Sequence, residues 1–304
     1  MLSRDLAKYV DLRRSLGFKF RVQHILLRGF VAFAEERGDK HVLSARVLDW
    51  AARAPSPAQR RNRLLTVRRF ALAIHVENGR HQIPAADAIG RAVARRRIPY
   101  IYKPEEIVRL IRAAAALKPI GSIRPQTFAT LLGLLAATGM RISEALALQL
   151  GDVTADGLLV RETKFQKSRM LPLHPTTRRA LDSYLEARQR VGIMDRALFV
   201  SNTGRPLPYS TANSVFLQLR TCAGLECAPS QRKPRIHDLR HTFAVRSLEQ
   251  CRHDRDAVAR HIVALSTYLG HAHVTDTYWY LQATPALMAR IATAGERLLV
   301  GGAA

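Results

Sequence analysis

The sequence predicts a mainly α-helical protein of two domains, the second of which is a mixed α+β domain with a small β-hairpin or sheet. Apolar residues recur at helical spacing through most of the 304 residues. Residues 158–173 break this pattern with two short runs of strand-forming residues. A cationic segment with two prolines, Arg95 to Pro104, divides the chain into a smaller and a larger block, and the length suits two domains.

The first domain, residues 1–97, is predicted to be a small helical bundle. We expect Ser44 to cap the N-terminus of its third helix, and Pro84 follows the fourth helix. The predicted helices cover residues 6–16, 25–33, 47–51 and 64–76. Residues 98–103 form the predicted basic linker between the two domains.

The second domain, residues 104–304, opens with Pro104 at the first position of a helix, followed by Glu105 and Glu106 in the first turn. Two short strands are expected at 158–163 and 169–173, with residues 164–168 as the turn that joins them. Further helices are predicted over residues 176–190, 209–222, 239–250, 257–269 and 285–299.

The chain carries a large surplus of positive charge. Its 48 basic and 24 acidic residues give a formal net charge of +24, and 40 of the basic residues are arginines. A field of this sign attracts polyanions, among which nucleic acid is a commoner partner than anionic membrane. Arginine also binds phosphate through two parallel hydrogen bonds. The charge therefore predicts nucleic-acid binding, and the basic linker is either a solvated loop or part of a clamp around a duplex.

Several classes of protein are not expected from this sequence. The first 20 residues are interrupted by charges and do not form a secretory signal, so we expect the protein to stay inside the cell. Residues 125–140 lack charges but are too few to span a membrane, so no membrane partner is expected. The three cysteines, Cys222, Cys227 and Cys251, suit neither a disulfide framework nor a C-x-x-C zinc site.

Two short strings hold basic side chains at spacings that suit an anion site. Glu144 follows Arg141 by three residues, which indicates either a structural ion pair or an arginine held rigid and aimed at a phosphate. His237 and Arg240 lie one helical turn apart on one face. His237 and His241 have metal-ligand spacing, but a glutamate after His237 and nearby cysteines are missing, so no metal is expected.

Two further strings add a candidate nucleophile and a lysine. Tyr280 follows the Leu-Gly-His string that ends at His271 by nine residues. The neighbouring aromatic residues Tyr278 and Trp279 are predicted to be core residues. Lys164 lies in the turn of the predicted hairpin, where a lysine is by default a solvated loop residue.

Taken in order, these strings resemble the tyrosine recombinase family, also called phage integrases, and its Xer-type members in particular. The resemblance covers residues 138–281 and suggests a protein of a mobile element. It implies a helical core-binding domain followed by a catalytic domain. It further implies a catalytic set in which Tyr280 is the nucleophile and Glu144 supports its neighbours, the other members being Arg141, Lys164, His237, Arg240 and His271. The 31 residues from Arg240 to His271 are more than expected, and the extra length is placed at 249–261.

The resemblance also implies a chemistry. Tyr280 would attack a DNA phosphate to form a 3′-phosphotyrosine bond, without metal or ATP. Arg141 and Arg240 would stabilise charge on the non-bridging oxygens, and the histidines would accept the phenolic proton. Lys164 would protonate the departing 5′-hydroxyl. We expect the surrounding cations to favour the phenolate of Tyr280, whose ordinary pKa is about 10.

The implied partner is double-stranded DNA, bound by a homotetramer on two DNA sites, with or without other recombinases. The implied location is the bacterial cytoplasm, at the nucleoid. The expected DNA contacts are Arg95, Arg96, Arg97, Lys103, Lys167 and Arg169. The apolar positions after Tyr280, such as Leu287 and Ile291, either dock on a partner or pack on their own domain. Three rival functions stay open: a DNA-binding accessory protein without catalysis, a type IB topoisomerase and a metal-dependent hydrolase. Tyr278 is the rival nucleophile.

Overall fold

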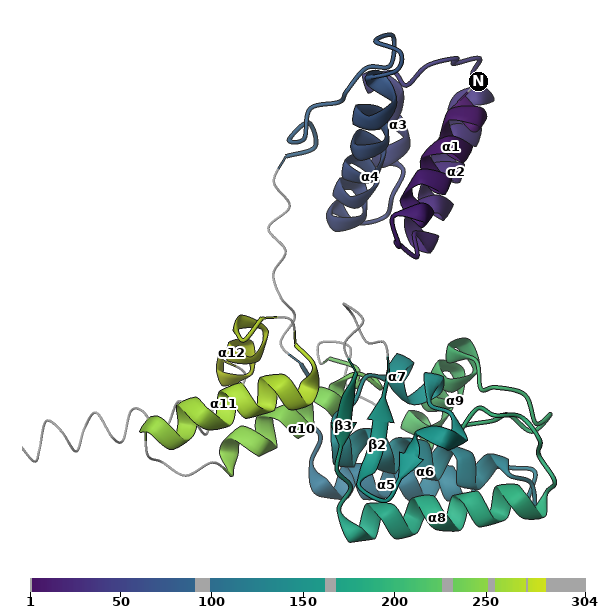
Figure 1. Ribbon diagram of the computed structural model, residues 1–304, viewed down its shortest axis with the longest axis vertical. Coiled ribbons are helices and arrows are strands. Elements are labelled where there is room, and N and C mark those ends of the chain that lie inside the picture. Colours follow the sequence, from purple (N-terminus) through teal and green to yellow (C-terminus); the bar gives the residue numbers. More distant parts are fainter. Residues whose placement is uncertain are drawn as a thin grey trace, which may run out of the picture. The chain divides into compact units, whose positions relative to one another are not determined.

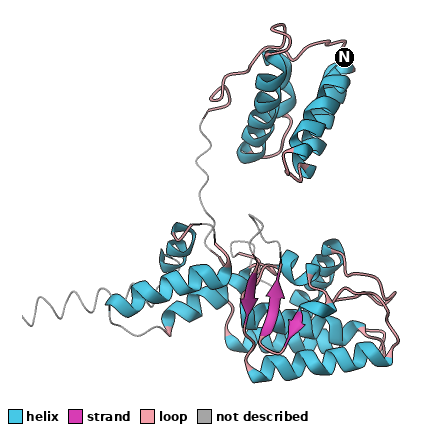
Figure 2. Ribbon diagram, in the orientation of Figure 1, coloured by secondary structure: helices cyan, strands magenta, loops and turns pink. Residues whose placement is uncertain are grey.

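The computed structural model describes residues 2–90, 99–161, 168–225, 232–250, 255–271 and 273–282. The chain forms two compact units, Met1–Arg97 and Ile98–Ala304 (Figure 1). Each unit has its own hydrophobic core. Both units are predominantly helical, and the strands all belong to the second (Figure 2). This agrees with the predicted fold class.

The first unit is a bundle of four helices: α1 (Leu2–Ser15), α2 (Arg21–Glu35), α3 (Ser44–Ala52) and α4 (Pro57–His75). Its core includes Phe30, Leu64 and Phe70, which are fully buried. Helix α4 begins seven residues before the predicted start at residue 64. The reason is local, because the amide of Gln59 donates to Ser56 Oγ at 3.3 Å and Pro57 occupies the first helical turn.

The start of α3 differs from the prediction that Ser44 caps this helix. Ser44 is the first helical residue, and Leu43, which cannot accept a hydrogen bond through its side chain, stands before it. The amide of Ser44 donates instead to Gln82 Oε1 at 2.8 Å. A distant side chain thus satisfies an amide that a local cap would otherwise bind.

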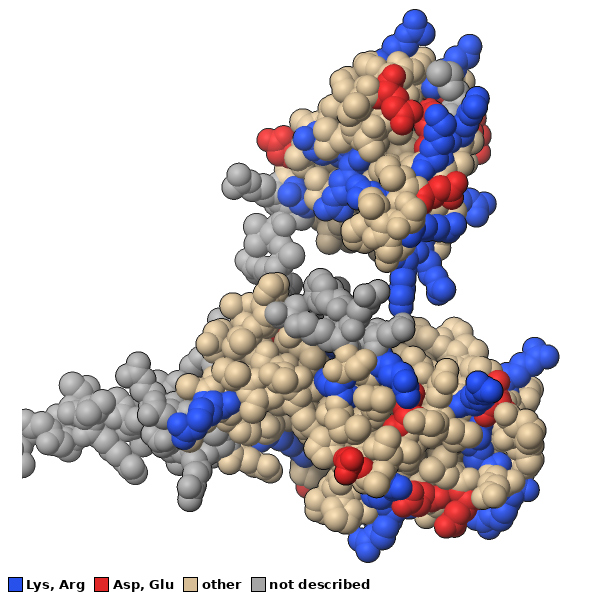
Figure 3. Space-filling view, in the orientation of Figure 1, with Lys and Arg blue, Asp and Glu red and all other residues tan. Residues whose placement is uncertain are grey.

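Arginines on the first unit stack on its aromatic rings. The guanidinium groups of Arg37 and Arg53 lie 3.7 and 4.4 Å from the centre of the Phe33 ring, and that of Arg63 lies 4.6 Å from the Trp50 ring. Such stacking restricts the guanidinium groups while leaving their charge in place. Basic side chains are spread over the visible face of each unit, with acidic ones between them (Figure 3).

The main core of the second unit lies among α5 (Pro104–Ala115), α6 (Arg124–Thr138), α8 (Pro175–Arg190) and α9 (Tyr209–Cys222). Helix α6 is central, since it contacts α5, α8 and α10 (Asp238–Glu249). Helix α5 begins at Pro104 as predicted, and the amide of Lys103 donates to Glu106 Oε2 at 2.7 Å. The short helix α7 (Ile142–Ala147) and a 3-10 turn (Leu150–Asp152) lead from α6 to the sheet.

The sheet is antiparallel and has three strands in the order β1 (Val153–Thr154), β2 (Gly157–Val160) and β3 (Arg169–Leu171). The pairing of Val160 with Arg169 sets the register of the predicted hairpin. Strand β3 lies within its predicted range, and β2 begins one residue before the predicted start at residue 158. Strand β1 was not predicted because two residues show no periodicity. The predicted turn, including Lys164, lies mostly outside the described residues.

Helices α10, α11 (Arg255–Leu269) and α12 (Thr275–Gln282) enclose a smaller core of their own. Leu248, Leu265 and Tyr280 belong to it. The bounds of α10 and α11 differ from the predicted ones by one or two residues. The predicted helix over 285–299 and its apolar positions lie outside the described residues.

Residues that the sequence assigns to the end of the linker are part of the second unit. Tyr102 is fully buried, its amide donates to Thr242 Oγ1 at 2.9 Å, and its hydroxyl donates to the Arg235 carbonyl at 2.9 Å. Arg246 in turn donates to the Tyr102 carbonyl at 2.6 Å. The aromatic character of this stretch, not its charge, decides its position. Among the described residues, the helices are all too short or too polar to cross a membrane.

Candidate active site

Two helices end at glycines, and each glycine lies next to a candidate site residue. Gly139 follows α6 with φ +59°, and Gly270 follows α11 with φ +66°, a left-handed conformation that glycine adopts without strain. The amide of His271 donates back to the Ser266 carbonyl at 3.0 Å. These turns bring Arg141 to the end of α11, where its Nη2 donates to the Gly270 carbonyl at 3.3 Å.

Arg141 and Glu144 form the predicted pair at the start of α7. The backbone amide of Arg141 donates to Glu144 Oε2 at 2.9 Å, and its Nη1 donates to Oε1 at 2.8 Å. A glutamate three residues into a helix commonly binds the amide before the helix in this way. The Glu144 carboxylate therefore both caps α7 and orients the guanidinium of Arg141.

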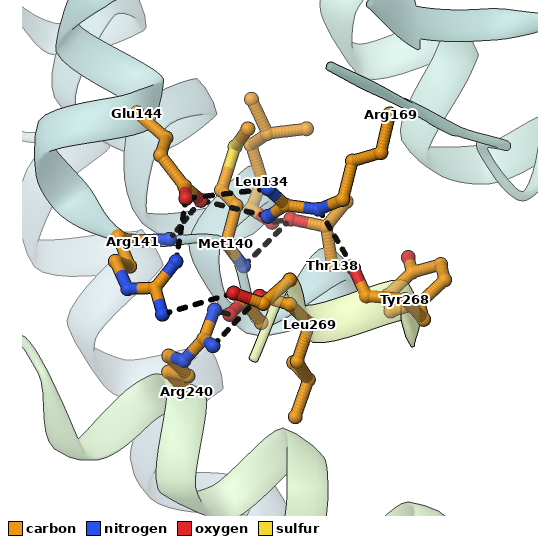
Figure 4. A network of polar contacts seen from close by, with 11 residues as sticks. Leu134, Thr138, Met140, Arg141, Glu144, Arg169, Arg240, Tyr268 and Leu269 are labelled. Carbon is orange, nitrogen blue, oxygen red and sulfur yellow. Dashed lines mark hydrogen bonds and ion pairs between the residues drawn. The ribbon is translucent and has the colours of Figure 1, made fainter. Parts of the chain in front are cut away.

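A second guanidinium, that of Arg169 on β3, also binds Glu144 (Figure 4). Its Nη2 and Nη1 donate to Glu144 at 2.8 and 3.3 Å, and its Nε donates to the Tyr268 carbonyl at 2.8 Å. Burial raises the pKa of Glu144, but the hydrogen bonds from Arg169 and Arg141 outweigh burial and hold the pKa below its ordinary value. The side chain of Arg169 is 11% exposed, which does not agree with its predicted place on the DNA.

Arg240, in the first turn of α10, is buried between two helix ends. Its Nη1 donates to the Gly139 carbonyl at 2.9 Å and its Nη2 donates to the Leu269 carbonyl at 2.8 Å. Burial, followed by the positive charge of Arg141, lowers the pKa of Arg240 to about 10. Its guanidinium remains charged at neutral pH and is held in one orientation.

Three histidines surround this pair of arginines. The rings of His237 and His241 meet edge to face with centroids 4.9 Å apart, and Nδ1 of His271 lies 2.8 Å from the Thr277 hydroxyl. Burial, followed by the charge of Arg240, lowers the pKa of His237. The same two causes lower the pKa of His271 to about 4. These two imidazoles are therefore neutral at pH 7 and able to accept a proton.

The Tyr280 side chain is 3% exposed and lies on α12 against the histidines. Its ring centroid is 6.0 Å from that of His271 and 5.5 Å from that of His241. Burial raises the pKa of Tyr280, although the charges of Arg240 and Arg141 act in the opposite direction. The arginines thus act in the expected direction, towards the phenolate, but burial outweighs them in this conformation and the neutral histidines add no positive charge.

Tyr278 does not lie in the core as predicted. It is 50% exposed, whereas Tyr280, two residues later on the same helix, is buried. Residues two apart on a helix point in different directions, so only one of them faces the histidines. The side chain of Trp279 lies outside the described residues.

The structure thus brings together five predicted catalytic residues and the supporting Glu144, from segments as far apart as residues 141 and 280. The five are Arg141, His237, Arg240, His271 and Tyr280. Lys164, Lys167 and Arg95 to Arg97 lie outside the described residues, and Lys103 is exposed beside α5. His241 was considered only as a metal ligand; its position one turn after His237 is the signal that places it here. Within the described ranges, His, Cys, Asp and Glu form no group of three or more that could hold a metal ion.

Comparison with known proteins gives consistent matches along the chain. The description "Phage integrase family" matches residues 101–286. "Putative integrase/recombinase y4rB" of Sinorhizobium fredii is 38% identical over 292 residues, which are 92% of each chain. "Tyrosine recombinase XerD" of Caulobacter vibrioides is 31% identical, over 89% of this chain and 82% of the relative. The Tn1549 transposon integrase, solved in complex with transposon right end DNA, has a similar fold, with a TM-score of 0.67 and 16% identity over 98% of this chain and 99% of that one.

Proposed function

The chain belongs to the phage integrase family of tyrosine recombinases, enzymes of site-specific DNA recombination, and on this basis we propose that it cleaves and rejoins DNA through a bond between Tyr280 and a 3′-phosphate. The observation that carries the proposal is the convergence of two arginines and the imidazoles on one phenol. Arg141 and Arg240 donate to the adjacent carbonyls of Gly270 and Leu269, and both lower the pKa of Tyr280 through their charge. The rings of His241 and His271 lie beside that of Tyr280.

Arg141 and Arg240 are proposed to bind the phosphate that is cleaved. Attack at phosphorus builds negative charge on the two non-bridging oxygens, and prearranged guanidinium groups stabilise this transition state more than the ground state. Both groups are oriented before DNA arrives, Arg240 by two carbonyls and Arg141 by Glu144. Loss of one such donor typically costs about 100- to 1000-fold in rate.

The predicted catalytic residues also account for the proton of Tyr280 and for the departing 5′-oxygen. The Tyr280 oxygen forms a bond to phosphorus, its proton passes to a neutral imidazole, His237 or His271, and the bond from phosphorus to the 5′-oxygen breaks. Lys164 is proposed to give that oxygen a proton. The phosphotyrosine bond keeps the energy of the broken linkage, so a second 5′-hydroxyl can attack it without ATP, and no metal ion is assigned a role.

The buried position of Tyr280 has a consequence for this reaction. We propose that α12 shifts when DNA binds, because the side chain of Tyr280 is only 3% exposed and its oxygen is covered by the protein. Such a shift would remove the effect of burial, which raises the pKa of Tyr280, while Arg240 and Arg141 would still lower it. We therefore propose that DNA binding itself activates the nucleophile.

DNA is proposed to bind both units and to be the scaffold of assembly. The exposed Lys103, the basic run from Arg95 to Arg97 and Lys167 are the proposed contacts, together with the guanidinium groups stacked on the first unit. A homotetramer on two DNA sites follows from the resemblance to Xer-type proteins. A role in a mobile element, and a location in the bacterial cytoplasm at the nucleoid, are proposed from the resemblance to tyrosine recombinases.

A covalent trap tests the proposal. The protein is incubated with nicked suicide substrates that carry candidate sites, and adducts that survive detergent are counted. Tyr280→Phe should abolish the adduct and leave DNA binding intact, while the matched variant Tyr278→Phe should still form it. An adduct that persists in Tyr280→Phe and disappears in Tyr278→Phe would overturn the assignment. Recombinant products on paired sites distinguish a recombinase from an enzyme that only relaxes supercoils.

A further inference from the structure

Three successive carbonyls at the C-terminal end of α11 each accept a hydrogen bond from a different arginine. The carbonyl of Tyr268 binds Arg169 from β3 at 2.8 Å, and that of Leu269 binds Arg240 from α10 at 2.8 Å. The Gly270 carbonyl binds Arg141 from the start of α7 at 3.3 Å. The last carbonyls of a helix lack partners within it and carry partial negative charge, which suits them to cationic donors.

Arg169 has a second contact that links it to the same site. Its fork binds both oxygens of Glu144, which also receive the amide and Nη1 of Arg141. A carboxylate offers about four acceptor positions, so these four bonds fill it. The side chains of Glu144 and Arg169 are 8% and 11% exposed, so water does not readily replace a lost bond.

We propose that Arg169 is a positioning residue of the DNA-cleavage reaction: it holds Glu144 and the end of α11, and through them fixes Arg141 and His271, without touching DNA. The inference rests on the proposed function and assigns to that site a residue whose predicted role was a DNA contact. It differs from a purely structural ion pair because of what its two partners hold. Glu144 binds Arg141, which is assigned to the phosphate, and the end of α11 precedes His271, which is assigned to the proton.

The packing around Gly270 supports the same role. A Cβ atom at this glycine would lie 2.8 Å from Nη1 of Arg169 and 3.1 Å from its Cζ. The guanidinium thus lies directly against the turn that carries His271. Any displacement of Arg169 frees this turn at the point where α11 ends. Arg169 binds the Tyr268 carbonyl and Arg240 binds the Leu269 carbonyl that follows it. The same displacement therefore also removes a hydrogen bond that holds the backbone beside Arg240.

The test replaces Arg169 with methionine, which keeps most of the length of the side chain and removes its donors. Arg178→Met is the matched control, since Arg178 also bridges a carboxylate and a carbonyl, those of Asp182 and Thr154, at 3.0 and 2.6 Å. This control lies on α8 and binds the opposite edge strand of the sheet. The two readouts are the single-turnover rate of adduct formation and the DNA affinity as a function of salt.

We expect Arg169→Met to lower the cleavage rate by about 100-fold, the scale of a misplacement of about 1 Å in an active site. DNA affinity and its salt dependence should stay those of the natural protein, and Arg178→Met should cleave normally. Cleavage by Arg169→Met at the natural rate would overturn the inference. So would a weaker affinity with a salt slope smaller by about one phosphate, because this marks a DNA contact.

Two further variants keep the test decisive if Arg169→Met folds poorly. Arg169→Lys keeps the charge but not the planar fork, so it should bind DNA normally and cleave with a smaller loss. In Glu144→Gln, adding Arg169→Met should lower the cleavage rate by a smaller factor than it does in the natural protein, because both changes disturb one network. Fully additive losses would contradict the inference. Failure of the natural chain to form any Tyr280 adduct would refute the proposed function instead.

Discussion

Replacing Arg240 with lysine should make DNA cleavage depend on pH where the natural protein does not. Burial and the charge of Arg141 lower the pKa of Arg240 from its usual 12.5 to about 10. The same depression acting on a lysine, whose ordinary pKa is about 10.4, brings it to about 8. Lysine at this position would therefore lose its charge as the pH rises through about 8, and only its charged form would stabilise the phosphate.

The charged and titratable groups that act on position 240 are Arg141, Glu144, Arg169 and Tyr280. They come from three segments, the start of α7, β3 and α12, and do not change in the variant. Adduct formation by Arg240→Lys is measured from pH 6 to pH 9 at subsaturating DNA, so that the rate reports the pKa of the free protein. It should fall about tenfold per pH unit above about 8 and level off below it. The natural protein should show no such decline, since its guanidinium keeps its proton. A variant whose pH profile parallels that of the natural protein would refute the burial argument.

Three other predictions follow from the same structure. Gly139→Ala should lower the free energy of unfolding by about 2–5 kcal/mol in urea titrations, because its Cβ would lie 2.5 Å from Phe243 at a positive φ; Gly151→Ala, which meets no atom within 4 Å, should have little effect. The free energy of unfolding should decrease as the pH falls from about 6.5 towards 4, because burial lowers the pKa of His271 to about 4 and that of His241 to about 3, so the unfolded chain binds more protons; His241→Gln should weaken this dependence, and an unchanged slope would contradict it. Log affinity for DNA should fall with log salt at about −0.9 per phosphate neutralised, and binding that ignores salt would count against the phosphate contacts.

Much of the fold follows from periodicity. Helices α8 and α9 lie within one residue of their predicted bounds, since both combine an apolar face with a clear start. Strand β1 and the first turns of α4 were missed, because two residues carry no period and the cap at Ser56 acts through local geometry. The start of α3 depends on Gln82, which no local pattern relates to Ser44.

The site was predicted by residue type and order, but its electrostatics were not. Arg169 was expected to contact DNA, while its bonds to Glu144 and to the end of α11 turn it inward. Tyr280 was expected to favour the phenolate, yet its burial raises the pKa. Both differences have one cause. The free energy cost of removing a charge from water depends on how deeply the folded protein buries it, and the local sequence does not specify that burial.

By itself the sequence determined the helical class, the surplus of positive charge and the spacing of Arg141, His237, Arg240, His271 and Tyr280, because these depend on residue types and on distances along the chain. Tertiary structure alone decided that three arginines meet at the end of α11, that the histidines are neutral and that Tyr280 is covered while Tyr278 is exposed. Hydrogen bonds between groups more than 90 residues apart along the chain, and the exclusion of water around them, form only when the helices have packed.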